Sequence, residues 1–361
     1  MDIAVVTGPA GLVGGEAVRV LSKRFDLVVG LGEQPRSDVR ETGRAPNVRH
    51  HRVDLRDHAA IAEVFRGYGT DVRLVVHTAA HPELAPPAQD PLPTFGAAAL
   101  GTVGLLEAVR ARCPDAVFVL DSTVDVYGDV PERLPLVETM TRWELDPAHP
   151  WYERGVDESM RLDRADRVFP AVSLLAADLA AQDHARRFGM KVGVFRSGHL
   201  TARSAPPTGQ GFLSNLVRDA VRGIPVTIRG HGGKQVRDVL DAADLVEMFW
   251  QFHLAPRPGE VYHAGGGRDR GGSILEVIAE YEHLTGRQVP FEYSPEAEYA
   301  DVRWWLTDTR RFRRDYPRWR PTLGLVDLLA AAHRFWNGFG RTVPPGPGEA
   351  ALDPGSAPVL G

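Results

Sequence analysis

Residues 7–14 read Thr-Gly-Pro-Ala-Gly-Leu-Val-Gly, and they join a short apolar run to a stretch with helical spacing of apolar residues. Gly8 permits a tight turn, Gly11 lets the backbone approach a pyrophosphate, and Gly14 allows the helix to pack closely on a sheet. The amino end of such a helix faces an anion with unsatisfied N–H groups and a favourable dipole. A simple strand-to-helix turn is the plainer alternative, but the position of the glycines predicts a dinucleotide site.

Strands and helices alternate around this turn through the first two-thirds of the chain. Strands separated by helices pair in parallel through right-handed crossovers, so the pattern predicts an α/β fold with a Rossmann-type doubly wound parallel sheet. The expected strands are Ile3 to Thr7, Leu27 to Leu31, Val48 to Val53, Leu74 to His77, Val117 to Leu120 and Lys191 to Phe195. The expected helices are Gly14 to Arg24, Ala59 to Tyr68, Ala97 to Arg112 and Val172 to Phe188.

Near residue 209 the regular alternation of strands and helices gives way to shorter elements, which predicts two lobes. We expect an NAD(P)-binding Rossmann domain at 1–205, to which 237–253 could return, and a smaller α/β substrate-binding lobe at 206–335. The second lobe is expected to contain helices at Phe212 to Arg222 and Ala242 to His253 and a strand at Val226 to Arg229. The proline-rich segment Pro82 to Pro93 predicts an irregular loop, because proline lacks the N–H that a strand needs. The Pro-, Gly- and Ala-rich tail 343–361 is expected to be disordered.

Composition narrows the class of protein. The 361 residues are 43% hydrophobic and 25% charged, which is typical of a soluble globular chain. The net charge of −5 offers no long-range attraction to nucleic acid. The single cysteine, Cys113, cannot form an internal disulfide, and the His pairs lack partners at metal-ligand spacing, so we expect no metal. Without a recognisable leader or an apolar run of about 18 residues, a cytoplasmic protein with no membrane span is predicted.

The acidic residue Glu33 follows the glycine turn at about the 20-residue distance at which such a residue usually receives the ribose hydroxyls of NAD. Gly30 and Gly32 occupy the strand end where an Asp would be expected, and Arg36 and Arg40 could meet a 2′-phosphate. We therefore expect NAD, with NADP as the alternative.

Further motifs follow the later strands: Asp54-Leu55, His77-Thr78-Ala79-Ala80, and Ser122-Thr123 with Val126-Tyr127-Gly128. With the glycine turn, they resemble the extended short-chain dehydrogenase/reductases over about residues 1–335. Residues 233–240, Gly-Lys-Gln-Val-Arg-Asp-Val-Leu, and residues 157–159, Asp-Glu-Ser, make the chain similar to nucleotide-sugar epimerases of the CDP-tyvelose 2-epimerase type, in the NAD-dependent epimerase/dehydratase family. With the turn, the resemblance implies cofactor contacts at Gly8, Gly11, Leu12, Val13, Gly14, Glu33, Asp54, Leu55, Ala79 and Ala80.

The chain departs from that family at its proton relay. In the family a Tyr and a Lys four residues later begin one helix, the Tyr as general acid/base and the Lys lowering its pKa. Alignment through Ala176-Ala177-Asp178 places Pro170 and Leu174 at these positions, and sliding by one gives Phe169 and Ser173. The family's Asn falls at Ala98. We interpret the usual relay as replaced.

Other residues are candidates for the lost roles. The resemblance implies that Thr123 contacts the reacting hydroxyl, and His199 and His81 can exchange protons near neutral pH. A guanidinium matches phosphate oxygens bidentately, which supports Arg237 as a diphosphate ligand over a surface ion pair with a neighbouring Asp. The predicted catalytic residues are Thr123, His199 and His81, and the predicted substrate-binding residues are Arg237, Tyr152 and Arg303.

The leading hypothesis is an NAD(P)-binding, epimerase/dehydratase-like enzyme that acts on a nucleotide-activated sugar or a related polyhydroxylated small molecule without the Tyr/Lys relay. A non-redox lyase, isomerase or cyclase on the same scaffold is one alternative. A catalytically inactive, dinucleotide-binding regulatory subunit is another. The resemblance also allows a homodimer through the helices at Ala97 to Arg112 and Val172 to Phe188.

Overall fold

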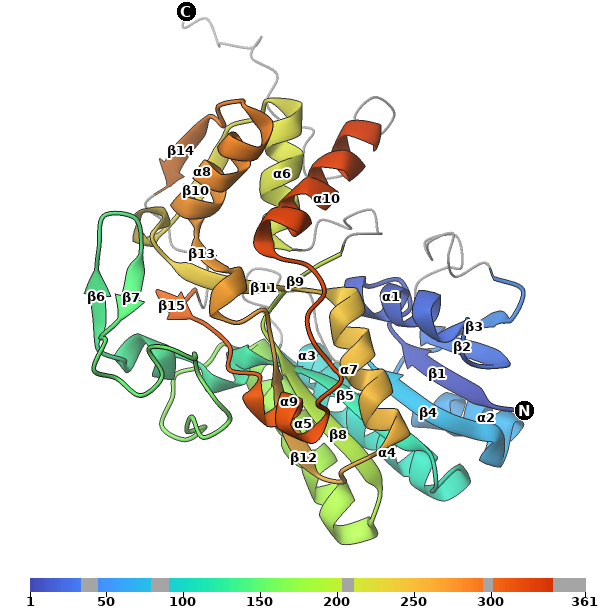
Figure 1. The fold of residues 1–361 in the computed structure, drawn as a ribbon. Coiled ribbons are helices and arrows are strands. Elements are labelled where there is room, and N and C mark those ends of the chain that lie inside the picture. The colour runs from blue at the N-terminus through green and yellow to red at the C-terminus, as the bar shows by residue number, and fades with distance from the viewer. Residues whose placement is uncertain (34–44, 79–90, 203–210, 295–300, 340–361) are drawn as a thin grey trace, which may run out of the picture.

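The computed structural model describes residues 1–33, 45–78, 91–202, 211–294 and 301–339. A parallel sheet of seven strands, in the order β12-β8-β5-β4-β1-β2-β3, forms its larger part (Figure 1). The sheet is of the predicted Rossmann type. Its strands are β1 (Ile3–Thr7), β2 (Leu27–Gly32), β3 (Val48–Arg52), β4 (Val72–His77), β5 (Val117–Thr123), β8 (Lys191–Ser197) and β12 (Glu260–Ala264).

Helices cover both faces of this sheet because alternate strand residues point to opposite sides. Ile3 and Val5 of β1 belong to the core beneath α2 (His58–Tyr68), α4 (Gly101–Arg112) and α5 (Phe169–Phe188). Ala4 and Val6 belong to the opposite core, which α1 (Leu12–Leu21) and α7 (Ala242–Leu254) cover. The helix α7 also packs against α1. The chain therefore enters the second lobe and then returns to the first sheet at α7.

The predicted strands and helices are present with shifted ends, and the prediction of an irregular loop at Pro82 to Pro93 is wrong at its end. Residues Pro91–Phe95 form the short helix α3, followed by a π-helical turn at Gly96–Leu100 that runs into α4. Pro91 and Pro93 are therefore helical, because the first turn of a helix does not need their missing N–H groups. The rest of the proline-rich segment, like the tail, lies outside the described residues. Similarly, α5 starts at Phe169 with Pro170 in its first turn.

The second lobe has its own core, to which α6 (Phe212–Arg222), α8 (Ile274–Thr285), α10 (Leu325–Phe339) and β10 (Val226–Arg229) contribute. The strand β14 (Phe291–Ser294) pairs with β10, and its side chains Phe291 and Tyr293 are exposed. Between the lobes lie the strands β9 (His199–Thr201), β11 (Val236–Asp241), β13 (Gly271–Ser273) and β15 (Trp304–Trp305). A hairpin of β6 (Leu136–Glu138) and β7 (Trp143–Leu145) flanks them (Figure 1).

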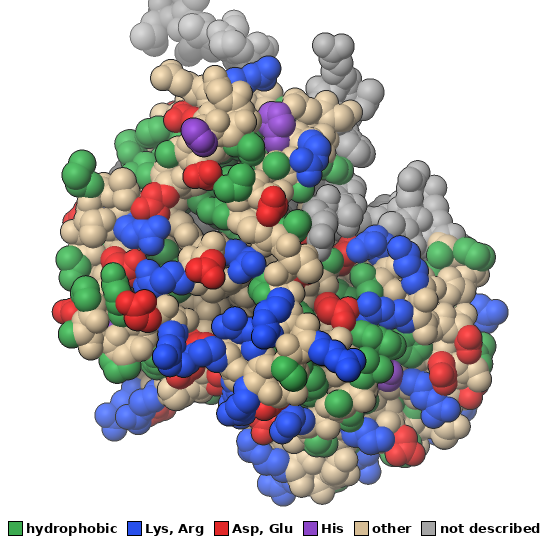
Figure 2. All heavy atoms as spheres, in the orientation of Figure 1, with side chains coloured by type: hydrophobic (Ala, Val, Ile, Leu, Met, Phe, Trp, Pro, Cys, Tyr) green, Lys and Arg blue, Asp and Glu red, His purple; other side chains and the backbone are tan. Residues whose placement is uncertain are grey.

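The surface shows basic side chains gathered over the face that carries α9 (Arg310–Asp315) (Figure 2). Carboxylates neutralise part of this charge, since Arg310, Arg311 and Arg314 pair with Asp308, Glu260 and Asp315 respectively. This face is therefore less cationic than its arginine content indicates.

The helical stretch Pro91–Arg112 is long enough to cross a membrane, and an 18-residue window within it is apolar enough by composition. The sequence prediction that no apolar run approaches this length is wrong for this stretch. Core helices of soluble proteins pass the same test, and 44% of that window is buried inside the fold, where α4 packs on α2 and α5.

Candidate cofactor and substrate site

The glycine turn between β1 and α1 has the geometry of a close-approach cradle. Gly8 has a φ of +63°, its amide donates to the carbonyl of Leu31 at 2.9 Å, and its own carbonyl accepts from the amide of Gly11 at 3.0 Å. A Cβ on Gly14 would lie 2.0 Å from that carbonyl oxygen, and a Cβ on Gly11 would lie 3.3 Å from it. Any side chain at Gly14 would collide with the backbone of the turn. The turn, with Leu12 and Val13 opening α1, fits the phosphates of a dinucleotide.

A chain of hydrogen bonds holds the strand ends beneath this turn. The hydroxyl of Thr102 donates to the carbonyl of Ala98 at 2.5 Å, so it accepts from Nε2 of His77 at 2.8 Å. In the neutral ring Nδ1 of His77 is then the acceptor of the Thr7 hydroxyl at 2.7 Å, and the Thr7 oxygen accepts from the Thr78 amide at 3.1 Å. The histidine thus ties β1 and β4 to α4 and has a structural role.

Two acidic residues predicted to contact the adenosine are brought together by an arginine. The guanidinium of Arg56 binds the carboxylate of Asp54 with distances of 2.6 to 2.9 Å, and its Nη2 lies 3.9 Å from Oε1 of Glu33. Leu55, which lies between Asp54 and Arg56 in the sequence, is buried. Arg56 was not among the residues predicted from the sequence, although it directly follows Asp54-Leu55. Arg36, Arg40, Ala79, Ala80 and His81 lie outside the described residues.

At the end of β5, Thr123 bonds to Asp125 in two ways. The hydroxyl oxygen of Thr123 accepts from the backbone amide of Asp125 at 3.1 Å, and the hydroxyl donates to Oδ2 of the same residue at 2.9 Å. These bonds begin the 3-10 turn Val124–Tyr127, which packs against α5. Thr123 is 6% exposed, while Asp125 is partly exposed. Asp125 was not among the residues predicted from the sequence, where its only signal was a carboxylate two residues after the predicted Thr123.

The first turn of α5 carries Phe169 and Pro170, the two residues that the predicted alignment places at the family's Tyr position. Phe169 is 37% exposed, and its ring centroid lies 6.3 Å from that of Phe95 in α3. Pro170 carries no protic group. Leu174 is buried in the main core, and the Ser173 hydroxyl donates to the Phe169 carbonyl at 3.1 Å.

His199 and Arg237 lie on one face of a small sheet. His199 of β9 pairs with Val239 of β11, and Arg237 lies two residues before Val239, so the two side chains are diagonal neighbours. Burial, together with the charge of Arg237, lowers the pKa of His199 to about 3, so the imidazole is neutral at pH 7. Its buried Nδ1 has no hydrogen-bond partner among the described residues.

The Arg237 guanidinium is itself buried and pairs with Asp301. The alternative of a surface ion pair with a neighbouring Asp is therefore not what the structure shows. Nη1 also donates to the carbonyl of Val236 at 2.7 Å. Because Asp301 offsets its charge, an anionic ligand here would have to compete with that carboxylate.

The structure gives Tyr152 and Arg303 partners in a charged cluster around the β6–β7 hairpin. The guanidinium of Arg268 lies 4.8 Å from the centroid of the Tyr152 ring and bonds to Glu144 at 2.9 Å. Arg303 binds Glu132 at 2.7 Å, and its guanidinium lies 4.9 Å from the centroid of the Trp143 ring. These contacts tie the hairpin to the second lobe.

A buried network links α5 to the loop that precedes it. Arg196 binds Asp178 through Nε at 2.9 Å and donates from Nη1 to the hydroxyl of Tyr127 at 2.8 Å. That hydroxyl also lies 2.7 Å from Nε2 of His263, whose Nδ1 lies 3.0 Å from the carbonyl of Val156. Since Nδ1 must donate to a carbonyl, Nε2 accepts from Tyr127. Burial, the largest effect, lowers the pKa of His263 to about 4 and so keeps the ring neutral.

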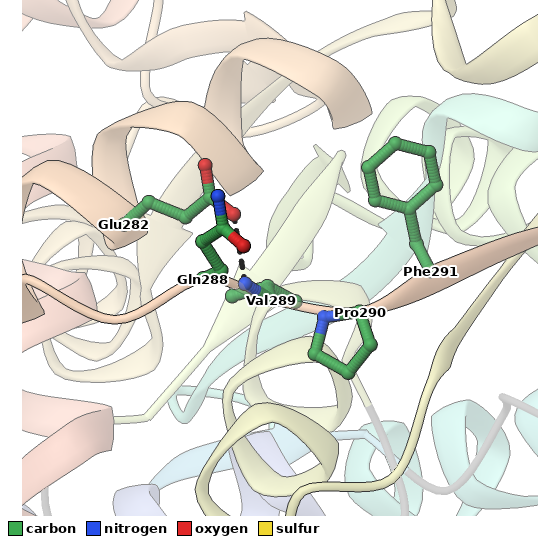
Figure 3. Close-up of a pocket in the computed structure, with 5 residues that line it drawn as sticks. All are labelled: Glu282, Gln288, Val289, Pro290 and Phe291. Carbon is green, nitrogen blue, oxygen red and sulfur yellow. Dashed lines mark hydrogen bonds between the residues drawn. The ribbon is translucent and has the colours of Figure 1, made fainter.

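A hollow lined by Glu282, Gln288, Val289, Pro290 and Phe291 lies away from these residues, between α8 and β14 (Figure 3). The Glu282 carboxylate there accepts from the Val289 amide at 2.7 Å, so it closes the end of α8 on the following strand. Within the described ranges, the structure contains no group of three or more His, Cys, Asp or Glu that could hold a metal ion.

Comparison with known proteins agrees with this geometry. A model of a family described as the NAD dependent epimerase/dehydratase family matches residues 4–153 and 170–265. CDP-paratose 2-epimerase of Salmonella typhi is 29% identical over 336 residues, which cover 90% of this chain and 96% of that protein. UDP-glucose 4-epimerase 2 of Oryza sativa is 28% identical, over 81% of this chain and 71% of its own length.

Solved structures share the fold. dTDP-glucose 4,6-dehydratase of Bacillus anthracis in complex with NAD superposes with a TM-score of 0.74 at 20% identity, over 94% of this chain and 97% of that one. UDP-glucose 4-epimerase of Thermus thermophilus in complex with NAD gives 0.73 at 23% identity, over 93% and 99%.

Proposed function

This chain belongs to the NAD dependent epimerase/dehydratase family, whose cofactor is NAD, and we propose that it is an enzyme acting on a nucleotide-activated sugar without the family's Tyr/Lys relay. The glycine turn carries the cofactor part of the proposal, because only a residue without a Cβ fits at Gly14. The relatives named for CDP-paratose and UDP-glucose support the substrate class.

The residues around the turn would hold the cofactor in defined ways. The amide groups at the start of α1 would bind its phosphates, and Glu33 would accept hydrogen bonds from the adenosine ribose. Asp54 and Leu55 would border the adenine, with Arg56 fixing the Asp54 carboxylate. When bound, NAD supplies an acceptor for a hydride from a sugar carbon.

The apolar start of α5 supports the absence of the usual relay. In the aligned registers the first turn offers Pro170 or Phe169, and the Lys position falls on Leu174 or Ser173, whose hydroxyl is bound to the backbone. No side chain among these four can take a proton near pH 7. We therefore propose that another group at the end of β5 handles the proton of the reacting hydroxyl. Arg237 would contact the anionic part of the substrate in competition with Asp301.

We also propose that the chain works as a cytoplasmic homodimer. The exposed side chains Phe169, Val172 and Leu179 lie along one face of α5, and a second copy of the chain would bury them. The buried, unpaired thiol of Cys113 suits a reducing compartment.

Two measurements test the function. Calorimetry on protein freed of endogenous nucleotide should show saturable NAD binding that is weaker for NADP. Incubation with NAD and CDP-paratose, UDP-glucose or UDP-glucuronic acid in deuterated water, followed by mass spectrometry and NMR of the sugar, should reveal an epimer or a dehydrated product. NAD binding without any sugar product would favour the inactive regulatory subunit. Product formed by cofactor-free protein would favour the non-redox enzyme.

A further inference from the structure

We propose that Thr123 and Asp125 form a proton-accepting pair that does the work of the missing Tyr and Lys. This inference rests on the proposed function and names the group that receives the hydroxyl proton of the substrate. The observation that carries it is the direction of the Thr123 hydroxyl, which points to a carboxylate rather than to solvent or to a backbone carbonyl.

The hydrogen-bonding capacity of Thr123 leaves one way for it to meet a substrate. A threonine hydroxyl has one hydrogen to donate and two lone pairs to accept with. The hydrogen goes to Oδ2 of Asp125, and one lone pair accepts from the Asp125 amide. The remaining lone pair can only accept, so a sugar hydroxyl bound here must donate its hydrogen to Oγ1 of Thr123.

A purely structural turn would need only one of these two hydrogen bonds, the one from the Asp125 amide to the Thr123 hydroxyl oxygen. Ser and Thr commonly begin a turn by accepting from a backbone amide two residues on, and Thr123 does so. Such capping leaves the hydroxyl hydrogen free to point anywhere. The second bond, from Oγ1 to Oδ2, is therefore the feature that a cap does not explain.

Thr123 and Asp125 lie at the carboxyl end of β5, where a bound sugar hydroxyl would release its proton. Thr123 ends β5, in the centre of the sheet beside β4, and ligands of parallel α/β sheets bind at the carboxyl ends of the strands. The 3-10 turn with Asp125 packs against α5, the helix that carries the positions of the lost relay. Oδ1 of Asp125 receives no hydrogen bond from any described residue, and the side chain is partly exposed. A proton on this carboxyl could therefore exchange with solvent.

His199, the other described candidate, is less suited to accept this proton. Burial beside Arg237 lowers the pKa of its imidazole to about 3. It remains able to make neutral hydrogen bonds to a substrate.

The proton movement balances. The O–H bond of the sugar breaks and its proton forms a bond to Oγ1 of Thr123, while the original hydrogen of Thr123 passes to Oδ2 of Asp125. With NAD bound as the hydride acceptor, the electron pair of the adjacent C–H bond would leave as hydride, so that an alcohol and a carboxylate would become a ketone and a carboxylic acid. Reversal of the same proton path would return the hydrogen when the ketone is reduced.

The test separates proton acceptance from structure. Asp125→Asn keeps the backbone amide that caps the turn but cannot take a proton, so kcat with NAD and CDP-paratose should fall about 100-fold or more while KM changes little. Thr123→Val should lose a similar factor in kcat, and Thr123→Ser should restore most of it. Asp129→Asn, in the following turn and outside the pair, is the matched control and should behave like the wild type.

Binding gives a readout that does not depend on turnover. By calorimetry, Thr123→Val should bind the nucleotide sugar more weakly, because it loses the acceptor for the sugar hydroxyl, whereas Asp125→Asn should bind it with unchanged affinity. Near-normal kcat in Asp125→Asn would overturn the pair and leave the proposed function standing. A wild-type protein that binds NAD but converts none of the three nucleotide sugars would overturn the proposed function and the pair with it.

Discussion

At the residue scale, steric exclusion and hydrogen-bond direction explain more of the site than charge does. Gly14 is required because the carbonyl of Gly8 occupies the place of a side chain. The hydroxyls of Thr123, Thr102 and Tyr127 each have a determined direction because their other partners are fixed. Each direction decides whether the oxygen can donate to a ligand or only accept from one.

Gly14→Ala should weaken NAD binding by at least about tenfold, which corresponds to about 1.4 kcal/mol. The reason is the 2.0 Å approach of the new Cβ to the Gly8 carbonyl, which must shift the turn. Calorimetric titration with NAD measures the change. Gly67→Ala in α2 is the control, since a Cβ there meets nothing within 4 Å, and it should leave NAD affinity unchanged and stabilise the fold by about 0.5–1 kcal/mol. Equal NAD affinity in Gly14→Ala would contradict the cradle.

His263 should make the fold sensitive to acid. Its pKa is about 4 in the folded chain and near 6.5 when unfolded, so the unfolded state binds more protons as the pH falls through that window. The contribution of this group is therefore complete above pH 6.5 and falls by about 3 kcal/mol by pH 4, because one pKa unit corresponds to about 1.4 kcal/mol.

Urea denaturation at pH 7, 6 and 5 measures this dependence. His263→Gln should lower stability at pH 7 by breaking the network with Tyr127, and it should flatten the loss between pH 7 and pH 5. His283→Gln, at an exposed position of α8, should keep the wild-type slope. A slope that is identical in His263→Gln and the wild type would show that other groups control the acid response.

At the scale of elements, α5 contacts the sheet on one face, a buried polar network through one residue, and solvent on its outer face. Its inner face packs on the sheet through Leu174 and Ala177, its buried Asp178 anchors the network through Arg196, and its outer face leaves Leu179 half exposed. The first turn adds the apolar pair of Phe169 and Phe95. A helix built this way suits packing against a second copy.

Leu179→Lys should therefore convert a dimer to a monomer in light scattering coupled to size-exclusion chromatography. The introduced ammonium would have to be desolvated in the interface, and two of them would face each other near the symmetry axis. Leu254→Lys, at the exposed end of α7, is the matched control and should leave the molecular mass unchanged. A wild-type protein that is monomeric at all concentrations would rule out this interface.

At the scale of the whole molecule, the glycine turn lies within the first lobe, while β9 and β11 join the strand end of β8 to the second lobe. Glu144 of the β6–β7 hairpin binds Arg142 in the hairpin's own turn, and Arg268 and Trp304 outside the hairpin. Burial raises the pKa of Glu144, but bonds from Arg268 and the Leu145 amide outweigh it and leave the pKa below its usual value. The cluster thus keeps a charged carboxylate between the lobes.

Ligand binding should be visible in the stability of the entire chain. Because NAD would bind only the folded state, a concentration of 100 times its Kd should stabilise the protein by about 2.7 kcal/mol and raise Tm. Differential scanning calorimetry with and without NAD measures this, and AMP serves as the control for occupation of the adenosine half alone. An unchanged Tm at saturating NAD would argue against the assigned turn.

The outline of the fold was predictable because its determinants are local. The spacing of glycines in residues 7–14 and the alternation of strand and helix patterns depend only on neighbours along the chain. The helical start at Pro91 was missed because proline is equally at home in a loop and in the first turn of a helix. Asp125 was not predicted because its proposed role depends on the direction of the Thr123 hydroxyl, which only the folded structure shows.

The sequence alone therefore determined the Rossmann sheet and the place of the glycine turn between its first strand and helix. Only the tertiary structure decided that Arg237 is paired with Asp301, that Arg56 joins Asp54 to Glu33, and that His199 is buried and neutral. The physical reason is that backbone sterics and hydrophobic periodicity act over a few residues, whereas the partner and burial of a polar side chain depend on segments that meet only when the chain packs.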